Sequence, residues 1–121
     1  MRFLSVVRID ERSGQVPSQQ LRNDMGKLIE EMTREGALVS TAGLRPTAEG
    51  VRVRLRGGKL STVDGPFAET KEVIGGFAML QARSMKDAVE LTKRFLKIHG
   101  EEWDIECEVR QLDGPDFGAE A

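Results

Sequence analysis

Side chains suited to acid/base chemistry gather in one short stretch of the chain. Asp64, Glu69 and Glu72 are the candidate catalytic residues, because two carboxylates that share a pocket leave one of them with a raised pKa suited to proton transfer. Lys71, within the same stretch, and Arg45, upstream, are candidate ligand-binding residues that would hold an anionic group. If the segment folds over a pocket, the stretch would therefore form a site of proton-transfer or lyase-type chemistry.

The same stretch also has a structural interpretation. In Asp64-Gly65-Pro66 the carboxylate can accept hydrogen bonds from turn amides, the glycine can take a positive φ, and the proline can end a strand. An identical tripeptide recurs at residues 113–115, so turn chemistry alone can produce it. The charges that follow Pro66 could form a solvated connection. Both interpretations stay open at this point.

Other chemistries have little support. His99 is the single histidine and Cys107 the single cysteine, so we expect no zinc cluster, no disulfide within the chain, no metal and no cofactor. The sequence contains no signature of a hydrolase triad. No motif by itself names a reaction, so the sequence does not decide whether the protein is an enzyme.

Charge and hydropathy limit the expected partners. Eighteen basic and twenty acidic residues give a formal net charge of −2, and the arginines at 52, 54 and 56 lack an aromatic platform, so no direct nucleic-acid partner is expected. The apolar run at the N-terminus is too short for a signal peptide, and no stretch is long enough to span a bilayer. We expect a cytoplasmic protein with no membrane partner.

Hydrophobic periodicity predicts the elements that position these residues. A helix is expected at 19–35, capped by Ser18, and a second after Ser84, ending near Gly100. Alternation predicts a hairpin of strands 51–56 and 59–63, with one dry face and an arginine face. Further strands are expected at 3–9, 38–40, 76–82 and 103–110.

These elements select a topology. The strands at 3–9 and 76–82 are apolar on both alternating sets, as the two middle strands of a sheet should be. The fold class is therefore α+β, a ferredoxin-like βαββαβ domain over residues 1–112 with an inserted β-hairpin, followed by a tail at 113–121 that we expect to be loose.

Two helices can cover only one face of such a sheet. The other face, with Phe3 or Leu4 and Ala78 or Met79, would stay exposed unless a second copy covers it. We therefore expect a homodimer, a dimeric α/β barrel with a pocket at each end.

The run Asp64 to Glu72, followed by Gly75-Gly76-Phe77, resembles the signature of DGPF proteins, a branch of the YCII-related family. The resemblance extends through Gly43-Leu44-Arg45-Pro46, Val51-Arg52-Val53, Gly57-Gly58-Lys59, Ser84 to Ala88, Glu106 to Leu112, and Asp116-Phe117-Gly118. It implies a dimeric ferredoxin-like α/β barrel. Members are largely of unknown function, and many DGPF proteins are encoded near extracytoplasmic-function sigma factors.

The resemblance also has departures. Some YCII-like proteins have been suggested to be enzymes that use a His and Asp pair, with the histidine on the first helix, where this chain has none. Similar sequences often carry a glutamate where this one has Ala42. The favoured hypothesis is a small-molecule-binding or regulatory module, with a possible small-molecule ligand and a possible sigma-factor or other transcription partner. The alternative is a small enzyme that uses Asp64 or Glu72 as its base.

Overall fold

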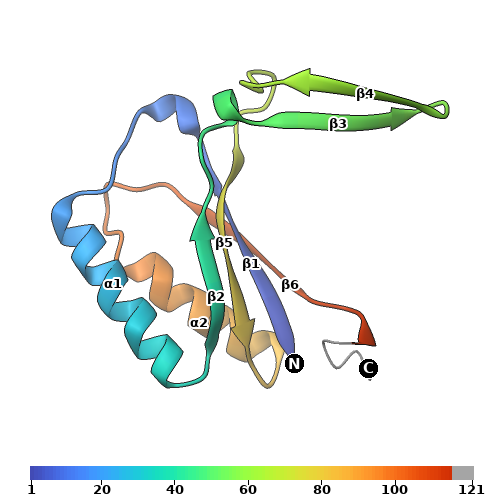
Figure 1. Ribbon diagram of the computed structural model, residues 1–121. Coiled ribbons are helices and arrows are strands. Elements are labelled where there is room, and N and C mark those ends of the chain that lie inside the picture. Colours follow the sequence, from blue (N-terminus) through green and yellow to red (C-terminus); the bar gives the residue numbers. More distant parts are fainter. Residues whose placement is uncertain (116–121) are drawn as a thin grey trace.

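The computed structural model describes residues 1–115 and contains six strands, two α-helices and two short 3₁₀ turns (Figure 1). In chain order the elements are β1 (Arg2–Ile9), η1 (Glu11–Ser13), α1 (Gln19–Arg34), β2 (Leu38–Gly43), η2 (Thr47–Glu49), β3 (Val51–Arg56), β4 (Lys59–Asp64), β5 (Val73–Gln81), α2 (Met85–Lys97) and β6 (Glu106–Gln111). Of the tail expected at 113–121, residues 116–121 lie outside this description.

Four strands form an antiparallel main sheet in the order β2-β5-β1-β6. With the β3–β4 hairpin set aside, this is the strand order of the ferredoxin-like βαββαβ fold. The two strands that are apolar on both alternating sets, β1 and β5, are the middle pair, as predicted. The mixed α+β class and the inserted hairpin are therefore confirmed, with β3 and β4 forming a separate two-stranded sheet.

Both helices begin where their capping residues predict. The Ser18 hydroxyl accepts a hydrogen bond from the Leu21 amide at 3.1 Å, and the Ser84 hydroxyl accepts one from the Asp87 amide at 3.1 Å. These bonds satisfy amides that have no partner inside the helix. Gly36 follows α1 with a positive φ of 76°, as its position after the helix predicts.

Both helices lie on one face of the main sheet, and the core lies between them and the sheet (Figure 1). Phe3 and Leu80, from β1 and β5, are its most completely buried large side chains. The neighbouring residues Leu4 and Met79 pair with each other and point to the opposite, outer face, because side chains alternate along a strand. Of the alternatives left open by the sequence, Leu4 and Met79 are therefore the outer-face residues.

Three sequence expectations need correction. The strand β2 continues to Gly43, beyond the predicted end at Ser40, because its last residues pair with β5. The strand β6 begins only at Glu106, so Trp103 precedes it; the Trp103 ring packs edge-on against His99 instead. The strand β5 begins at Val73, three residues earlier than expected.

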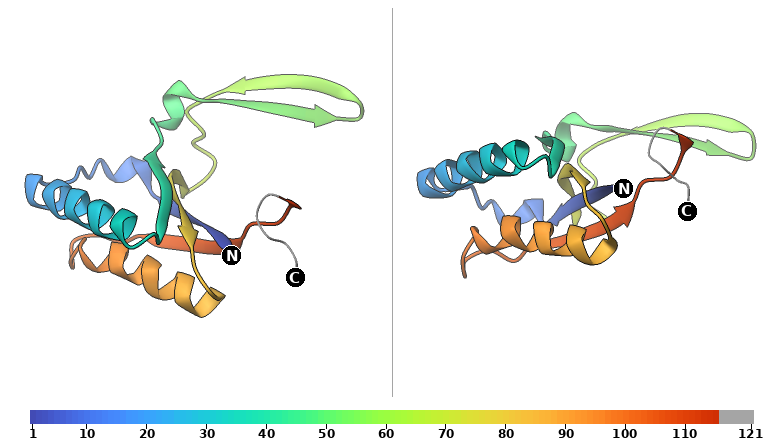
Figure 2. Two further views of the ribbon diagram at one scale, coloured as in Figure 1. Left: turned by 60° about the horizontal axis from the view of Figure 1, so that its bottom comes forward. Right: turned by 90° about the horizontal axis from the view of Figure 1, so that it is seen from below.

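The β3–β4 hairpin, which we call the arm, projects away from the main sheet (Figure 2). Its register pairs Arg56 with Lys59 across the Gly57-Gly58 turn, as the alternation predicts. The expectation of one dry face is wrong for this chain, because the apolar side chains of the arm are exposed. Nothing within residues 1–115 covers them.

Candidate functional site

The segment that follows the arm, residues 64–72, is anchored by its backbone. The amide of Gly65 donates a hydrogen bond to the Gly50 carbonyl at 2.9 Å, which closes the base of the arm. Gly65 does not have the positive φ that turn chemistry predicted. Glycine is required there for space, because a Cβ atom would overlap the backbone carbonyl of Thr47.

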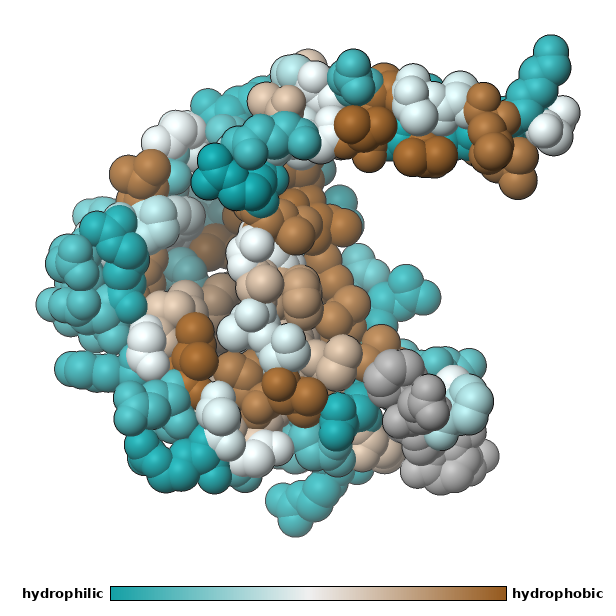
Figure 3. All heavy atoms as spheres, in the orientation of Figure 1, coloured by the Kyte–Doolittle hydropathy of each residue, from teal (hydrophilic) through white to brown (hydrophobic). Residues whose placement is uncertain are grey.

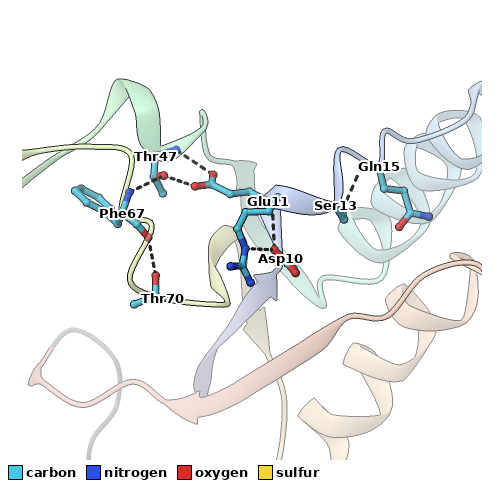
Figure 4. Close-up of polar contacts among 8 residues, drawn as sticks. Asp10, Glu11, Ser13, Gln15, Thr47, Phe67 and Thr70 are labelled. Carbon is cyan, nitrogen blue, oxygen red and sulfur yellow. Dashed lines mark hydrogen bonds and ion pairs between the residues drawn. The ribbon is translucent and has the colours of Figure 1, made fainter.

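Thr47 is the centre of a small hydrogen-bond network that joins three connections (Figure 4). Its amide donates to the Glu11 carboxylate at 3.1 Å, its hydroxyl also bonds that carboxylate, and the Phe67 amide donates to the Thr47 hydroxyl at 3.3 Å. The network ties the connection after β1 to the base of the arm. No sequence pattern indicates this network, because Glu11 and Thr47 lie far apart in the chain and neither belongs to a motif.

The predicted acidic residues fall in different environments. Asp64 is exposed, and no hydrogen bond to its carboxylate is found within residues 1–115. Glu69 forms an ion pair with Arg52, whose guanidinium also lies 3.9 Å from the centre of the Phe67 ring. The hydrogen bond from Arg52 lowers the pKa of Glu69. This is opposite to the raised pKa expected of a general base, so Glu69 is held ionised.

Arg45 and Glu72 are brought together at a polar cleft beneath the base of the arm. The cleft has a volume of about 410 Å³ and is also lined by Arg52, Phe67 and Thr70. Arg45 is exposed and forms a bidentate pair with Glu49, at 2.9 and 3.2 Å. Asp64, Glu69 and Lys71 do not line this cleft.

Glu72 is half-buried and lies between two clefts, since it also borders a shallow cleft of about 350 Å³ on the outer face. Leu4, Val6, Arg8 and Glu108 contribute to that second cleft. Among the three acidic candidates, Glu72 is therefore the one at a cavity wall. Hydrogen bonds from Arg12 lower the pKa of Asp10, and the positive charge of the exposed Lys71 adds a smaller lowering.

A cavity larger than these two clefts lies elsewhere, between the main sheet and the helices. It has a volume of about 450 Å³, and a hollow beside α1 is visible in Figure 3. Its walls are apolar side chains of α1, α2, β1 and β5, with small residues along the sheet. These small residues are Ala42, Gly43, Gly75, Gly76 and Ala78.

The polar groups of this cavity are hydroxyls. Ser5 and Thr92 are buried, with their oxygens 3.3 Å apart, and the Thr92 hydroxyl donates to the Ala88 carbonyl at 3.0 Å. Cys107 lies beside Ser5; burial raises the pKa of its thiol, and the hydrogen bond with Ser5 acts in the opposite direction. No Asp, Glu, Lys, Arg or His side chain among residues 1–115 lines this cavity.

This cavity was not predicted from the sequence, since pockets were expected only at the ends of a dimeric barrel. The small residues Gly75, Gly76 and Ala78 of β5 were the one available signal. Within the described part of the chain, no group of three or more His, Cys, Asp or Glu side chains could hold a metal ion. Over the same residues, no helix is both long enough and apolar enough to cross a membrane.

Comparison with known proteins places the chain in a family. An uncharacterized protein of Rhizobium meliloti (strain 1021) is 29% identical over 75 residues, which cover 62% of this chain and 60% of the relative, less than two thirds of its length. The crystal structure of CutA from Xylella fastidiosa is 13% identical and superimposes with a TM-score of 0.42, covering 93% of this chain and 85% of that one. Residues 1–96 match the sequence profile of the YCII-related domain. The chain therefore belongs to the YCII-related domain family.

Proposed function

We propose that this protein is a small-molecule-binding module whose ligand occupies the apolar cavity between the helices and the main sheet. The observation that carries the proposal is a cavity of about 450 Å³ with no ionisable side chain among its lining residues. Ligand sites of small molecules are typically concave, mostly apolar and about 300–1,000 Å³ in volume. An acid/base mechanism needs a titratable group at the reacting atoms, so the lining supports binding in preference to proton transfer.

The lining also defines the class of ligand. A charged group would lose its hydration there without gaining an ionic partner, so the ligand is neutral and largely apolar. The hydroxyls of Thr92 and Thr41 commit their protons to the Ala88 and Phe77 carbonyls, which leaves Ser5 as the hydroxyl at the wall whose bonds, to Thr92 and Cys107, are with other side chains. One polar atom of the ligand, placed near Ser5, would fit this arrangement.

A neutral fluorescent probe tests the proposal. N-phenyl-1-naphthylamine should bind the wild-type protein with enhanced emission, and Ala78→Leu, which adds three carbon atoms to the cavity wall, should weaken binding about 10-fold or more. Ala48→Leu is the matched control, because Ala48 is exposed in η2 and does not line the cavity. Equal probe binding by Ala78→Leu and wild type would contradict the proposal.

The proposed module is a homodimer that buries the outer face of the main sheet. Support comes from Leu4, Val6 and Met79, which lie on the two middle strands and are only half-buried in one chain. Burial of such a face against a second copy would remove apolar surface from water. Sedimentation equilibrium at micromolar concentration should report twice the mass of the chain, and a stable monomer would count against it.

A second candidate function is proton transfer at the polar cleft. Glu72 favours it, because this residue is half-buried and shares the cleft with Arg45, which could hold an anionic substrate in exchange for its exposed pair with Glu49. Wild type and Glu72→Gln can be screened together against carboxylic acids and ketones for proton exchange with D₂O, followed by NMR. Exchange that disappears in Glu72→Gln supports the candidate, and exchange by neither protein opposes it.

A further inference from the structure

The arm exposes more large apolar side chain than any other element of the described chain. Val51, Val53, Leu55 and Leu60 have 54%, 71%, 68% and 75% of their surface accessible to solvent. The first three alternate along β3, and Leu55 pairs with Leu60 across the hairpin, so all four lie on one face. Exposed apolar patches of this kind, bordered by polar residues, mark interaction sites in natural proteins.

The apolar side chains of the arm are exposed on a regular, hydrogen-bonded hairpin and not on an irregular loop. Its two strands are fully paired from Val51 with Asp64 to Arg56 with Lys59, and its base is fixed by the Gly65 to Gly50 hydrogen bond. The opposite face of β3 carries Arg52, Arg54 and Arg56, which are suited to water. The arm is therefore a preformed strand pair with one face for water and one face for a partner.

The apolar face of the arm and the outer face of the main sheet border the same concave surface. Figure 3 shows apolar residues along the side of the arm that faces the sheet and on the sheet itself. Val51 of the arm and Ile74 of β5, which is 54% exposed, line the same cleft at the corner between them. One body seated in this concavity would thus contact both surfaces at once.

We propose that the arm packs its apolar face against a second copy of this chain, so that each subunit of a homodimer is held by the arm of the other. The inference rests on the homodimer proposed above and adds the arm as its clasp. In a two-fold dimer the same patch serves both subunits, so the surface must complement itself.

Charge supports a second copy as the occupant. The apolar centre of the outer face is flanked by residues of both signs, with Glu108 lying 3.6 Å from Arg8 and 3.9 Å from Arg110. A face that mixes charges in this way can pair with a copy of itself, whereas a partner of one strong charge would meet repulsion. The apolar arm then supplies the remaining contact area.

The clasp also changes the polar cleft. Val51, Arg52 and Phe67 form its side toward the arm, and Glu72 and Ile74 its side toward the sheet. A partner seated in the concavity would close this cleft from the outside. Glu72 would then lie at the boundary between the two subunits.

A pair of adjacent substitutions tests the arm. Leu60→Asp places a charge on the apolar face, and Ser61→Asp places the same charge on the arginine face of the same strand. By sedimentation equilibrium, Leu60→Asp should raise the dimer dissociation constant about 100-fold, since both arms of the dimer are affected, while Ser61→Asp should change it less than about 3-fold. Both residues are exposed in the single chain, so neither change should alter its fold.

Photo-crosslinking gives an independent measurement. A benzophenone amino acid at position 60 should link two chains into a species of twice the mass, and the same group at position 61 should not.

Equal dimer strength in Leu60→Asp and Ser61→Asp, or crosslinks from position 60 only within one chain, would overturn the clasp while leaving a sheet-mediated dimer in place. A monomeric wild type at about 100 µM would overturn both. Failure of the wild-type protein to bind N-phenyl-1-naphthylamine would contradict the ligand proposal alone.

Discussion

The backbone carbonyl oxygen of Thr47 occupies the space that a Cβ atom at position 65 would need. Gly65 is thus fixed by its contact with η2, and its amide is committed to the Gly50 carbonyl in the same place. The start of the residue 64–72 segment therefore serves mainly as a junction that packs this segment against η2 and the base of the arm. Its charged residues are positioned by that junction, which aims Glu72 at a cleft and leaves Asp64 in solvent.

Gly65→Ala should destabilise the protein, because the new methyl group can fit only if the Thr47 backbone moves. Overpacking of this kind typically costs about 1–3 kcal/mol. Urea unfolding, measured at one protein concentration for both proteins, should give a lower free energy of unfolding for the variant. An unchanged value would mean that η2 shifts away freely and that the junction is soft.

Gly26→Ala is the matched substitution with the opposite expectation. Gly26 lies on the exposed side of α1, and a Cβ atom there meets nothing within 4 Å. Alanine in a helix interior is favoured over glycine by about 1 kcal/mol, so the free energy of unfolding should rise by about that amount. A decrease in the same urea assay would show that the α1 surface is covered by a partner.

Much of the fold followed from local patterns. The strands β1 and β5 are apolar on both alternating sets because both of their faces carry buried or half-buried side chains, and that placed them in the middle of the sheet. Gly57-Gly58 marked the turn of the arm because both residues need a positive φ there, 57° and 77°. Such signals lie within a few residues of the structure that they specify.

The candidate site was harder to predict because it depends on contacts between distant segments. The bond between Glu11 and Thr47 joins two loops with no sequence motif, and the cavity is a space that packing leaves unfilled beside Gly76 and Ala78. Alternation in β3 identified an apolar face correctly but could not say whether the same chain covers it.

The pairing of Glu35 with Arg94 should make stability depend on pH. The guanidinium donates two hydrogen bonds to the carboxylate, at 2.7 and 3.1 Å, and lowers the pKa of Glu35. A carboxylate with a lowered folded-state pKa stabilises the fold above its unfolded pKa, about 4.3, and this contribution disappears as the pH falls through the folded-state value.

Glu35→Gln should therefore reduce the difference in unfolding temperature between pH 7 and pH 3, relative to wild type. Glu30→Gln serves as the control, because its partner Arg34 lies on the same helix and their pair does not join two elements. The effect of Glu35→Gln should be larger at pH 7 than at pH 3. Equal effects at both pH values would show that the ion pair between Glu35, which caps the C-terminus of α1, and Arg94 of α2 does not form in solution.

Cys107 should react slowly with thiol reagents in the folded protein. The thiolate is the reactive form, and burial beside Ser5 raises the thiol pKa, so less thiolate is present at pH 8 than in an unfolded chain. Stopped-flow reaction with a disulfide reagent at pH 8 should be at least about 10-fold slower in buffer than in concentrated urea.

Because the folded pKa is raised, the thiol stabilises the fold below the unfolded pKa of about 8.5, and this contribution is lost as the pH rises through the folded value. Ser5→Ala removes the hydrogen bond that opposes the shift, so the folded variant should react more slowly than wild type; a faster reaction would indicate that the Ser5 side chain excludes the reagent by its bulk.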